Sequence, residues 1–289
     1  MRAIQRLASR LWPAGWHPGG IGWAASRGNL APQVVLFGHN DSLSGWAGAG
    51  PESEEIMIQV DPARPEVAAA ALEWCLATSS EPLLAIEVAA TDETLAGIVT
   101  GAGFVADESP GAGDGLRLSV EALLPSPPDG YEMRSVREDE TAARIEVHRA
   151  AWKPADLPTP EPDPDVDPNA TSPFNADAYA KVREAWLYDS AFDIVAVAPD
   201  GTLAGCCISW FDPASGVAEI EPLGVVPARR RLGVAGAMCH EVARRVRAAG
   251  GKEVFINVAV DLDYPASSGA YLKAGFKLFK RVDVYRLQR

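Results

Sequence analysis

Three short apolar runs, separated by turn residues, follow one another in the second half of the chain. They cover residues 192–198, 203–211 and 217–226, and the turns between them are Pro199-Asp200-Gly201 and Asp212-Pro213-Ala214-Ser215-Gly216. Proline, aspartate and glycine favour tight turns, and the runs are rich in β-branched and aromatic residues. We therefore expect three successive antiparallel strands.

The segment that follows has a different period. Apolar residues recur at positions 232, 234, 238, 242 and 246, which is the spacing of one helix face, and Gly250-Gly251 ends the pattern. The same reasoning predicts a strand at 131–136, a helix to 152, a helix at 177–188, a strand at 253–260, a helix at 267–274 and a closing strand pair at 276–287. This order, β, α, α, β, β, β, α, β, α, β, β, predicts an α+β fold with a mixed, mostly antiparallel sheet flanked by helices.

The first part of the chain resembles a weaker copy of this plan. Its predicted elements are strands at 34–38, 55–60 and 83–88 and helices at 66–78 and 92–101. The sharpest parallel is Thr100-Gly101-Ala102-Gly103-Phe104 beside Leu272-Lys273-Ala274-Gly275-Phe276. A length of 289 residues also suits two domains of about 150 residues each. The proline-rich stretch before Gly130 has the composition of a linker, so we expect domains at 1–125 and 131–289 joined by 126–130.

Seven prolines and five acidic residues lie between Lys153 and Ala176, which excludes a helix or a central strand there. Two interpretations remain open. The segment is either a solvated insertion or a lid whose carboxylates attract a cationic amine.

The net charge of −13 makes the average surface repel phosphate backbones and anionic lipid headgroups. Nucleic acid and membrane are therefore not expected as partners. The excess is uneven, because residues 1–128 contain 6 basic and 15 acidic residues, so the second half retains cations for an anionic ligand. The four cysteines have neither disulfide nor zinc spacing, no signal peptide or membrane span is evident, and we expect a cytoplasmic protein without a metal site.

Between the strand and the helix described above lies the sequence Val225-Val226-Pro227-Ala228-Arg229-Arg230-Arg231-Leu232-Gly233-Val234-Ala235. Main-chain N–H groups at a helix start have no partner within the helix, and small residues there allow an anion to approach them. Three arginines add positive charge. The segment predicts an anion site, although a solvated basic turn has the same composition.

This strand, loop and helix resemble the signature of the GNAT superfamily of acetyl-CoA-dependent N-acetyltransferases, in which Arg or Gln, two residues, Gly, one residue and Gly or Ala surround a pyrophosphate. Arg230, Gly233 and Ala235 occupy those positions. Downstream, Tyr271 to Phe276 resembles the second signature of the family. The resemblance covers essentially residues 130–289 and implies acetyl-CoA as the acyl donor.

The resemblance also implies residue roles. The main chain of Leu223, Gly224, Val225 and Val226 would bind the pantetheine arm, and Arg230, Arg231, Leu232, Gly233, Val234 and Ala235 would surround the pyrophosphate. Family members often place an asparagine where this chain has Tyr264, so Asn257 on the preceding strand is the substitute.

An acyl transfer to an amine needs a general base and a general acid. Glu219 and Glu221 lie two residues apart, and hence on one face of the predicted strand. Glu219 is the first candidate for the base and Glu221 the second, but both could instead bind a cationic substrate or pair with arginines. Tyr271 is the candidate acid that protonates the leaving thiolate, and core packing is its alternative role.

The copy of the anion loop in the first half, Val60-Asp61-Pro62-Ala63-Arg64-Pro65-Glu66, lacks the glycine and the arginine cluster. We therefore expect a degenerate GNAT-like domain that completes the fold, covers an acceptor cleft or forms a homodimer. Tandem arrangements of this kind occur in the superfamily.

The expected function is an acyl-CoA-dependent N-acetyltransferase that acts on a primary amine of a small cationic molecule. A noncatalytic acyl-CoA-binding or sensory module and a protein lysine acetyltransferase remain the alternatives.

Overall fold

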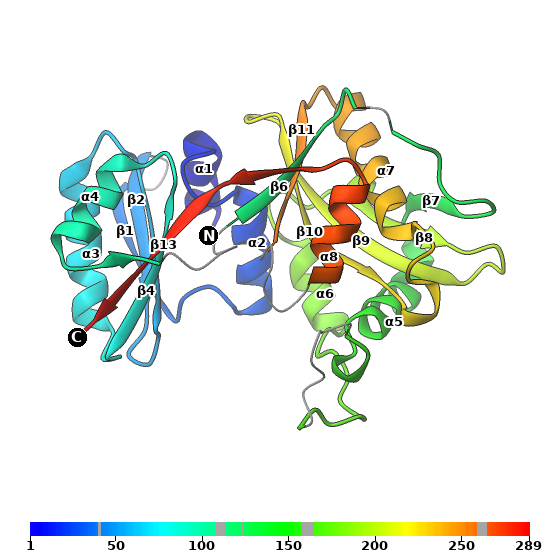
Figure 1. Cartoon of the computed structure of the whole chain (residues 1–289), viewed down its shortest axis with the longest axis horizontal. Coiled ribbons are helices and arrows are strands. Elements are labelled where there is room, and N and C mark those ends of the chain that lie inside the picture. The colour runs from blue at the N-terminus through cyan, green and yellow to red at the C-terminus, as the bar shows by residue number, and fades with distance from the viewer. Residues whose placement is uncertain (40–41, 108–113, 123, 158–164, 259–264) are drawn as a thin grey trace. The chain divides into compact units, whose positions relative to one another are not determined.

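The computed structural model describes residues 1–39, 42–107, 114–122, 124–157, 165–258 and 265–289. Contacts within the chain divide it into two compact units, of which the first contains residues 1–114 and 280–289 and the second contains residues 115–279. Each unit has its own sheet and its own hydrophobic core (Figure 1).

The sheet of the first unit has the strand order β1-β2-β3-β4-β13-β5, with β3 and β4 parallel and the other neighbours antiparallel. Its elements are α1 (Arg2–Leu11), α2 (Pro18–Arg27), β1 (Gln33–His39), β2 (Ser42–Ala49), β3 (Glu55–Val60), α3 (Pro65–Thr78), β4 (Leu83–Ala89), α4 (Glu93–Gly101), β5 (Val105–Ala106) and β13 (Val282–Gln288).

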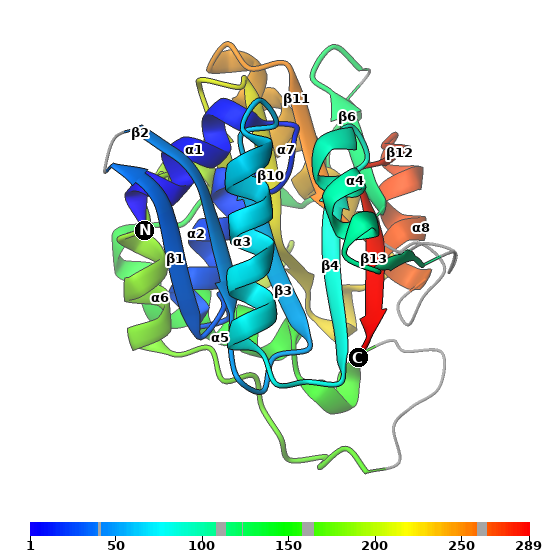
Figure 2. The same ribbon diagram turned by 90° about the vertical axis from the view of Figure 1, so that its left-hand side faces the viewer.

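Alternation along β2 and β3 gives this sheet two apolar faces. Ala47 and Ile58 pack with α3 and α4 on one face, whereas Trp46 packs with Leu7 of α1 and Ile21 of α2 on the other. Figure 2 shows α3 lying across the first of these faces.

The sheet of the second unit has the order β12-β6-β11-β10-β9-β8-β7, and β10 and β11 form its parallel pair. Its elements are β6 (Asp114–Ser119), β7 (Glu132–Ser135), α5 (Thr141–Ala151), α6 (Ala176–Arg183), β8 (Asp193–Val197), β9 (Leu203–Asp212), β10 (Val217–Val225), α7 (Val234–Ala248), β11 (Glu253–Asn257), α8 (Pro265–Lys273) and β12 (Lys277–Lys280). Short 3₁₀ turns, η1 (Glu138–Glu140), η2 (Pro154–Asp156), η3 (Ser190–Phe192) and η4 (Pro227–Arg229), lie between them.

The two faces of this sheet carry different helices. Cys207, Ile220 and Ile256 form the core with Met238 of α7 and with α8, while Cys206 packs with α5 on the other face. Two mixed and mostly antiparallel sheets flanked by helices confirm the predicted α+β fold class. No helix in the described part of the chain is both long and apolar enough to cross a bilayer.

The predicted element order of the second half is confirmed from β7 to β12, but the closing strand pair is wrong. β13 pairs along its length with β4 of the first unit, from Val282↔Ala89 to Gln288↔Leu83, whereas β12 lies in the other sheet. Strand β6 crosses the predicted boundary in the opposite direction. It precedes the predicted linker in sequence but pairs with β11 of the second unit. The compact units therefore begin and end at other residues than the predicted domain boundaries, because strand pairing over long sequence distances is not encoded in local composition.

The repeat suggested by the two Gly-Phe sequences extends to the backbone. Gly103 and Gly275 both have φ +95°, and the N–H groups of Phe104 and Phe276 donate over 3.1 Å to the carbonyls of Val99 and Tyr271. Both phenylalanines are buried. The helix-to-strand turn is thus the same in the two units.

A buried ion pair joins α5 to the start of β8. Arg144 Nε donates to Asp193 Oδ1 at 2.8 Å, and both side chains are completely inaccessible to solvent. Tyr179 and Tyr188 donate to Asp193 Oδ2 at 2.6 and 3.1 Å. Among the described residues, the two terminal nitrogens of Arg144 have no acceptor, so Asp193 carries most of the compensation for burying this cation.

Removing the carboxylate with Asp193→Ala should therefore destabilise the protein by about 3–5 kcal/mol, because it leaves a charged guanidinium buried without its partner. Chemical denaturation measures the loss. The exposed pair of Arg247 and Glu121 provides the control, since Glu121→Ala should cost less than about 1 kcal/mol. Equal costs for the two variants would contradict the role given to Asp193.

Candidate active site

A β-bulge interrupts strand β10 in the middle of the second sheet. Ile220 pairs with Ser209 and Leu223 pairs with Cys207, so Glu221 and Pro222 together face one residue of β9. Proline has no N–H group to donate to a ladder, and bulges are among the positions that tolerate it.

Beyond the bulge, the described residues pair with β10 on the β9 side only. Its parallel pairing with β11 covers Val217 to Glu219, while its pairing with β9 continues to Val225. The N–H of Val226 donates to the carbonyl of Ala204 on the β9 side, and alternation then directs the main-chain groups of Leu223 and Val225 the other way. This edge can bind an extended ligand through hydrogen bonds.

The loop after β10 ends in a left-handed turn that exposes a row of donors. Arg231 has φ +65° and Gly233, the N-cap of α7, has φ +82°, a conformation that favours glycine. Ala237 is the first residue whose N–H is bonded within the helix, to Gly233 at 3.0 Å. No described residue accepts from the N–H groups of residues 231–236. These groups and the helix dipole create positive potential at an exposed point.

Two of the three arginines are used to hold this loop. Arg229 pairs with Asp200. Arg230 donates to the carbonyl of Val225 at 3.1 Å, to that of Ala151 at 3.2 Å and to that of Asp156. Of the three, only the exposed Arg231 has no such partner in the described part of the chain. The loop thus offers mainly its main chain to a ligand.

Gly224 has a role that the sequence did not reveal. A Cβ atom at this position would lie 2.8 Å from Ala151 Cβ and 2.8 Å from Trp152 Nε1, so the end of α5 packs directly on the backbone of β10. Packing rather than contact with a ligand therefore requires glycine here. Nothing local in the sequence marks such a distant contact.

Glu219 lies where the pairing of β10 with β11 ends. Its side chain is 2% exposed, and its Oε1 accepts a hydrogen bond of 2.7 Å from Asn257 Nδ2 of β11. The two side chains join the strands at the point where they separate. The structure thus brings together Glu219, a predicted base, and Asn257, the predicted substitute for the family's asparagine. The amide of Asn257 donates to the carboxylate of Glu219 rather than pointing toward a ligand site.

Glu221 occupies the bulge itself. Burial, and secondarily the charge of Glu219, raises the pKa of its carboxyl to about 8. The indole N–H of Trp210, which is fully buried, donates to the carbonyl of Glu221 at 2.6 Å and fixes the bulge. Since Trp210 and Glu219 are direct partners in the β9 and β10 register, these residues share one neighbourhood.

Tyr271 lies on the other face of the sheet from Glu219. It is 7% exposed, belongs to the core with Ile220 and Met238, and its ring centroid is 5.9 Å from that of Phe276. Its packing role is visible in the structure, and its role as an acid stays a prediction. Tyr264 and the last residues of the strand expected at 253–260 lie outside the described residues.

The proline-rich segment is held at both ends. Its first residues form η2, where Arg230 bonds to Asp156. At its other end Phe174 is fully buried, with its ring centroid 4.1 Å from that of His148, and Arg149 donates to the Phe174 carbonyl at 3.2 Å. The described ends are anchored to α5 and to the candidate loop, whereas residues 158–164 lie outside the description.

The four cysteines, all buried and free, offer no nucleophile. Burial raises the pKa of Cys206 to about 11 and that of Cys239 to about 12, and it raises those of Cys75 and Cys207 as well. Thiolates are therefore scarce at neutral pH.

The start of α3 in the first unit corresponds to the start of α7 in the second, and the two helix starts carry different charged groups. β3 and β4 are also a parallel pair, joined at Glu55↔Ala85 and Ile56↔Ile86. However, α3 begins with Pro65, and Glu66 in its first turn accepts a hydrogen bond from Arg64 at 2.5 Å. A carboxylate already occupies the positive end of this helix, which disfavours an anionic ligand there.

A sheet that separates beside a bulge and leads into an open helix start offers main-chain groups to an extended, anionic ligand. The model of the Acetyltransferase (GNAT) family matches residues 157–276, so this segment of the chain is similar to that family. Acetyl-CoA, the predicted acyl donor, is the donor that this family uses.

The curated mycothiol acetyltransferase of Kineococcus radiotolerans is 34% identical to this chain over 100 residues. The match covers 35% of this chain and 31% of that protein, so the chain matches about a third of its relative's length.

Two solved structures share the fold over nearly the whole chain. One is a GCN5-related N-acetyltransferase from Sphaerobacter thermophilus, with 18% identity, a TM-score of 0.56 and coverage of 99% of this chain and 91% of that one. The other is a tandem GNAT protein from the clavulanic acid biosynthesis pathway, with 14% identity, a TM-score of 0.55 and coverage of 99% and 93%. The tandem arrangement expected from the sequence is thus found in a protein of the same fold.

The raised pKa of Glu221 gives a test by stability. The folded protein keeps this carboxyl protonated up to about pH 8, whereas the unfolded chain ionises it near its ordinary value of 4.5. The stabilisation is complete below the unfolded pKa and is lost as the pH rises from about 4.5 to 8. Glu221→Gln, which mimics the protonated form, should therefore gain stability relative to the natural protein across this window.

Urea denaturation at a series of pH values measures that difference. A flat curve for Glu221→Gln would show that this carboxyl ionises normally in the folded protein.

Proposed function

We propose that the second unit transfers the acetyl group of acetyl-CoA to a primary amine of a small cationic molecule. The proposal is carried by two groups of main-chain atoms, one at each end of the loop between β10 and α7. They are the side of β10 that faces away from β9 at Leu223 and the N–H groups of residues 231–236, for which no described residue is an acceptor. These two groups match a ligand that has an amide-containing arm followed by a pyrophosphate.

The residues present fit such a ligand. Leu223 and Val225 would bind the amide arm through the main chain, and the N–H groups from Arg231 to Gly236 would bind the pyrophosphate. The exposed side chain of Arg231 adds a permanent cation beside them. When bound, acetyl-CoA supplies the acyl group as an activated thioester.

The carboxylates at the bulge supply the base. An amine attacks a carbonyl carbon only in its neutral form, so a proton must leave the ammonium group of the acceptor. Glu221, with a pKa of about 8, binds a proton more strongly than an ordinary carboxylate and suits this role near neutral pH. Glu219, held by Asn257, lies beside it and is the second candidate for the base.

The other half of the proton transfer concerns the sulfur. As the new C–N bond forms and the C–S bond breaks, the leaving thiolate must gain a proton. Tyr271 is our candidate donor, because the family pattern places a tyrosine at this position. Its burial beside Ile220 of β10 puts it in the core under the strand that bears the bulge.

Several observations favour a cationic acceptor. The chain carries a net charge of −13, which increases the local concentration of a cation. Above its pKa of about 8, Glu221 adds a negative charge at the proposed reaction centre. The proline-rich segment adds acidic residues, of which Asp156 lies at the loop that Arg230 holds.

A charge placed at the helix start tests the donor site. Ala235→Glu puts a carboxylate among the unpaired N–H groups, and the affinity for acetyl-CoA should fall at least about tenfold, because the new charge repels the pyrophosphate and occupies its donors. Calorimetric titration with acetyl-CoA measures it. The same change at the other end of the helix, Ala248→Glu at an exposed position, is the matched control and should leave the affinity within about twofold.

If neither the natural protein nor the control binds acetyl-CoA at millimolar concentration, the proposal fails. If acetyl-CoA binds but no amine accelerates its consumption, a noncatalytic binding module is the better description. Acetylation of lysine in proteins in preference to small amines would favour the protein acetyltransferase.

The base is tested by the pH dependence of turnover. If Glu221 is the base, kcat/KM should rise about tenfold per pH unit up to about pH 8 and then level off. Glu221→Gln should lower kcat by about 10²–10⁴-fold and remove this limb. Glu253→Gln is a suitable control, because burial also raises the pKa of Glu253, at the far end of β11.

Asn257→Ala separates positioning from catalysis. Loss of its hydrogen bond to Glu219 should lower kcat while leaving the dissociation constant of acetyl-CoA within about twofold. A normal pH limb in Glu221→Gln, together with its loss in Glu219→Gln, would transfer the role of base to Glu219.

A further inference from the structure

Trp152, the C-cap residue of helix α5, packs on strand β10 beyond the bulge. A Cβ atom at Gly224 would lie 2.8 Å from Trp152 Nε1, and the indole centroid is 6.1 Å from the imidazole centroid of His148. Gly224 pairs directly with Cys206, whose side chain packs with Val147 of α5, so the contact lies on the α5 face of the sheet. The indole is therefore adjacent to the main chain that we expect to bind the amide arm of acetyl-CoA.

The indole is also accessible to a ligand. Trp152 is 37% exposed, whereas Cys206 of β9, at the same level of the sheet, is completely inaccessible to solvent. Packing thus covers the β9 side and leaves the indole accessible beside the free edge of β10. Among the described residues, Trp152 Nε1 has no hydrogen-bond acceptor. A ring with a free N–H donor matches an arm made of methylene groups and amide carbonyls.

The face that carries Trp152 also carries a candidate base. Ile220 belongs to the core on the α7 side, so the preceding Glu219 points to the α5 side by strand alternation. Trp152 and Glu219 thus lie on the same face of β10, one beyond the bulge and one before it. A ligand that runs along the free edge from the helix start to the bulge passes the indole.

Arg230 holds the end of α5 from the loop that follows β10. Its guanidinium donates to the carbonyl of Ala151, the residue before Trp152, at 3.2 Å, and to the carbonyl of Asp156 in η2. A third bond, of 3.1 Å, joins Arg230 to the carbonyl of Val225 on β10. Each nitrogen of this guanidinium therefore has a main-chain acceptor, and the segment that bears the indole is fixed to β10 on both sides of Trp152.

We infer that Trp152 is a further binding residue for the amide arm of the acyl donor, and that Arg230 is the positioning residue that holds it against β10. The inference rests on the proposed function and deepens it, because the arm gains a side-chain partner in addition to the main chain. The indole ring contacts the methylene groups and its N–H donates to an amide carbonyl. Arg230 acts through the carbonyls that it holds and makes no contact with the pyrophosphate.

Two ligands separate the arm from the pyrophosphate. Acetyl-CoA has both, whereas 3′-phospho-ADP has the pyrophosphate without the arm. In calorimetric titrations, Trp152→Ala should lower the affinity for acetyl-CoA about tenfold, because the arm loses an apolar contact and a donor. Its affinity for 3′-phospho-ADP should stay within about twofold of the natural protein, which also shows that the variant folds. Trp152→Phe, which keeps an apolar ring, should recover most of the loss.

Arg230→Ala should give the same pattern, with a loss of about fivefold for acetyl-CoA and no more than about twofold for 3′-phospho-ADP. In the double variant with Trp152→Ala, the arginine change should add less than about twofold, since both changes remove the same contact. Arg229→Ala is the matched control, because it removes the same charge from the same loop, and Arg229 pairs with Asp200 instead of holding α5. It should leave the affinity for both ligands within about twofold.

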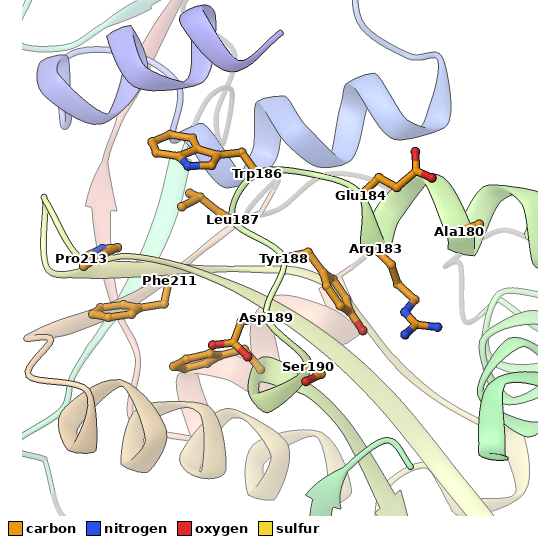
Figure 3. A pocket seen from close by; sticks show the side chains of 11 residues that line it. Ala180, Arg183, Glu184, Trp186, Leu187, Tyr188, Asp189, Ser190, Phe211 and Pro213 are labelled. Atoms are coloured by element: carbon orange, nitrogen blue, oxygen red, sulfur yellow. The ribbon is translucent and has the colours of Figure 1, made fainter. Parts of the chain in front are cut away.

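The control for the loss of an indole is Trp186→Ala. Trp186 is half-buried in the same unit and lies at a hollow with Leu187, Phe211 and Pro213 (Figure 3), so its removal should not change the affinity for acetyl-CoA. Equal losses in Trp152→Ala and Trp186→Ala, or an unchanged affinity in Trp152→Ala, would overturn the inference and leave the proposed function in place.

The role of Arg230 has its own contrary result. A loss of affinity for 3′-phospho-ADP in Arg230→Ala that Arg229→Ala does not share would make Arg230 a phosphate contact and overturn its positioning role. If the natural protein does not bind acetyl-CoA at millimolar concentration, the proposed function fails and the inference fails with it.

Discussion

The candidate site depends on the point at which β10 stops pairing with β11. Strand pairing normally uses every main-chain group, and a sheet interior has none to offer. Here the pairing with β11 ends at Glu219, and the bulge at Glu221 and Pro222 shifts the register with β9. The edge beyond is therefore available in the middle of a rigid sheet. A flexible loop could also present free donors, but it would first have to lose conformational entropy on binding.

Side chains stabilise the same point from both sides. Asn257 connects the separating strands through Glu219, and Trp210 holds the carbonyl of the bulge. Trp210 also contacts Tyr188, whose hydroxyl reaches the buried pair of Asp193 and Arg144. The bulge and the ion pair are thus parts of one packed network. A change at the ion pair would reach the proposed base through aromatic contacts rather than through a charge.

Turn residues and apolar spacing in the sequence correctly predicted the turns, helices and strands that depend on neighbouring residues. The turn residues around Asp200 and Asp212, the helical spacing after Leu232 and the Gly-Phe turn at Gly275 all correspond to observed elements. Helices α1 and α2 and strand β2 were not foreseen. β2 is rich in small residues such as Gly45 and Gly48, which are not typical of strands.

Long-range features were inaccessible from local patterns. The pairing of β13 with β4, and of β6 with β11, joins segments more than a hundred residues apart. The requirement for glycine at 224 comes from the approach of α5, and the inward direction of Arg230 comes from carbonyls at Ala151 and Asp156. At the candidate site, the residue roles named from the sequence stay predictions, and the contacts of these residues were not foreseen. It assigned phosphate contacts to an arginine that the folded protein uses to hold its own loop.

The two units share a strand pattern and a turn but differ at one helix start. Both contain a parallel strand pair within a mainly antiparallel sheet, and both use the same turn at Gly103 and Gly275. They differ at the first turn of the following helix. In the second unit that turn is free of acidic side chains and follows a left-handed glycine, whereas in the first it carries Pro65 and Glu66. A helix start attracts anions while its donors and its dipole are not already satisfied, and in the first unit the ion pair of Glu66 and Arg64 lies at that position. The two units thus share a strand pattern and a turn and differ in the charged groups at this helix start.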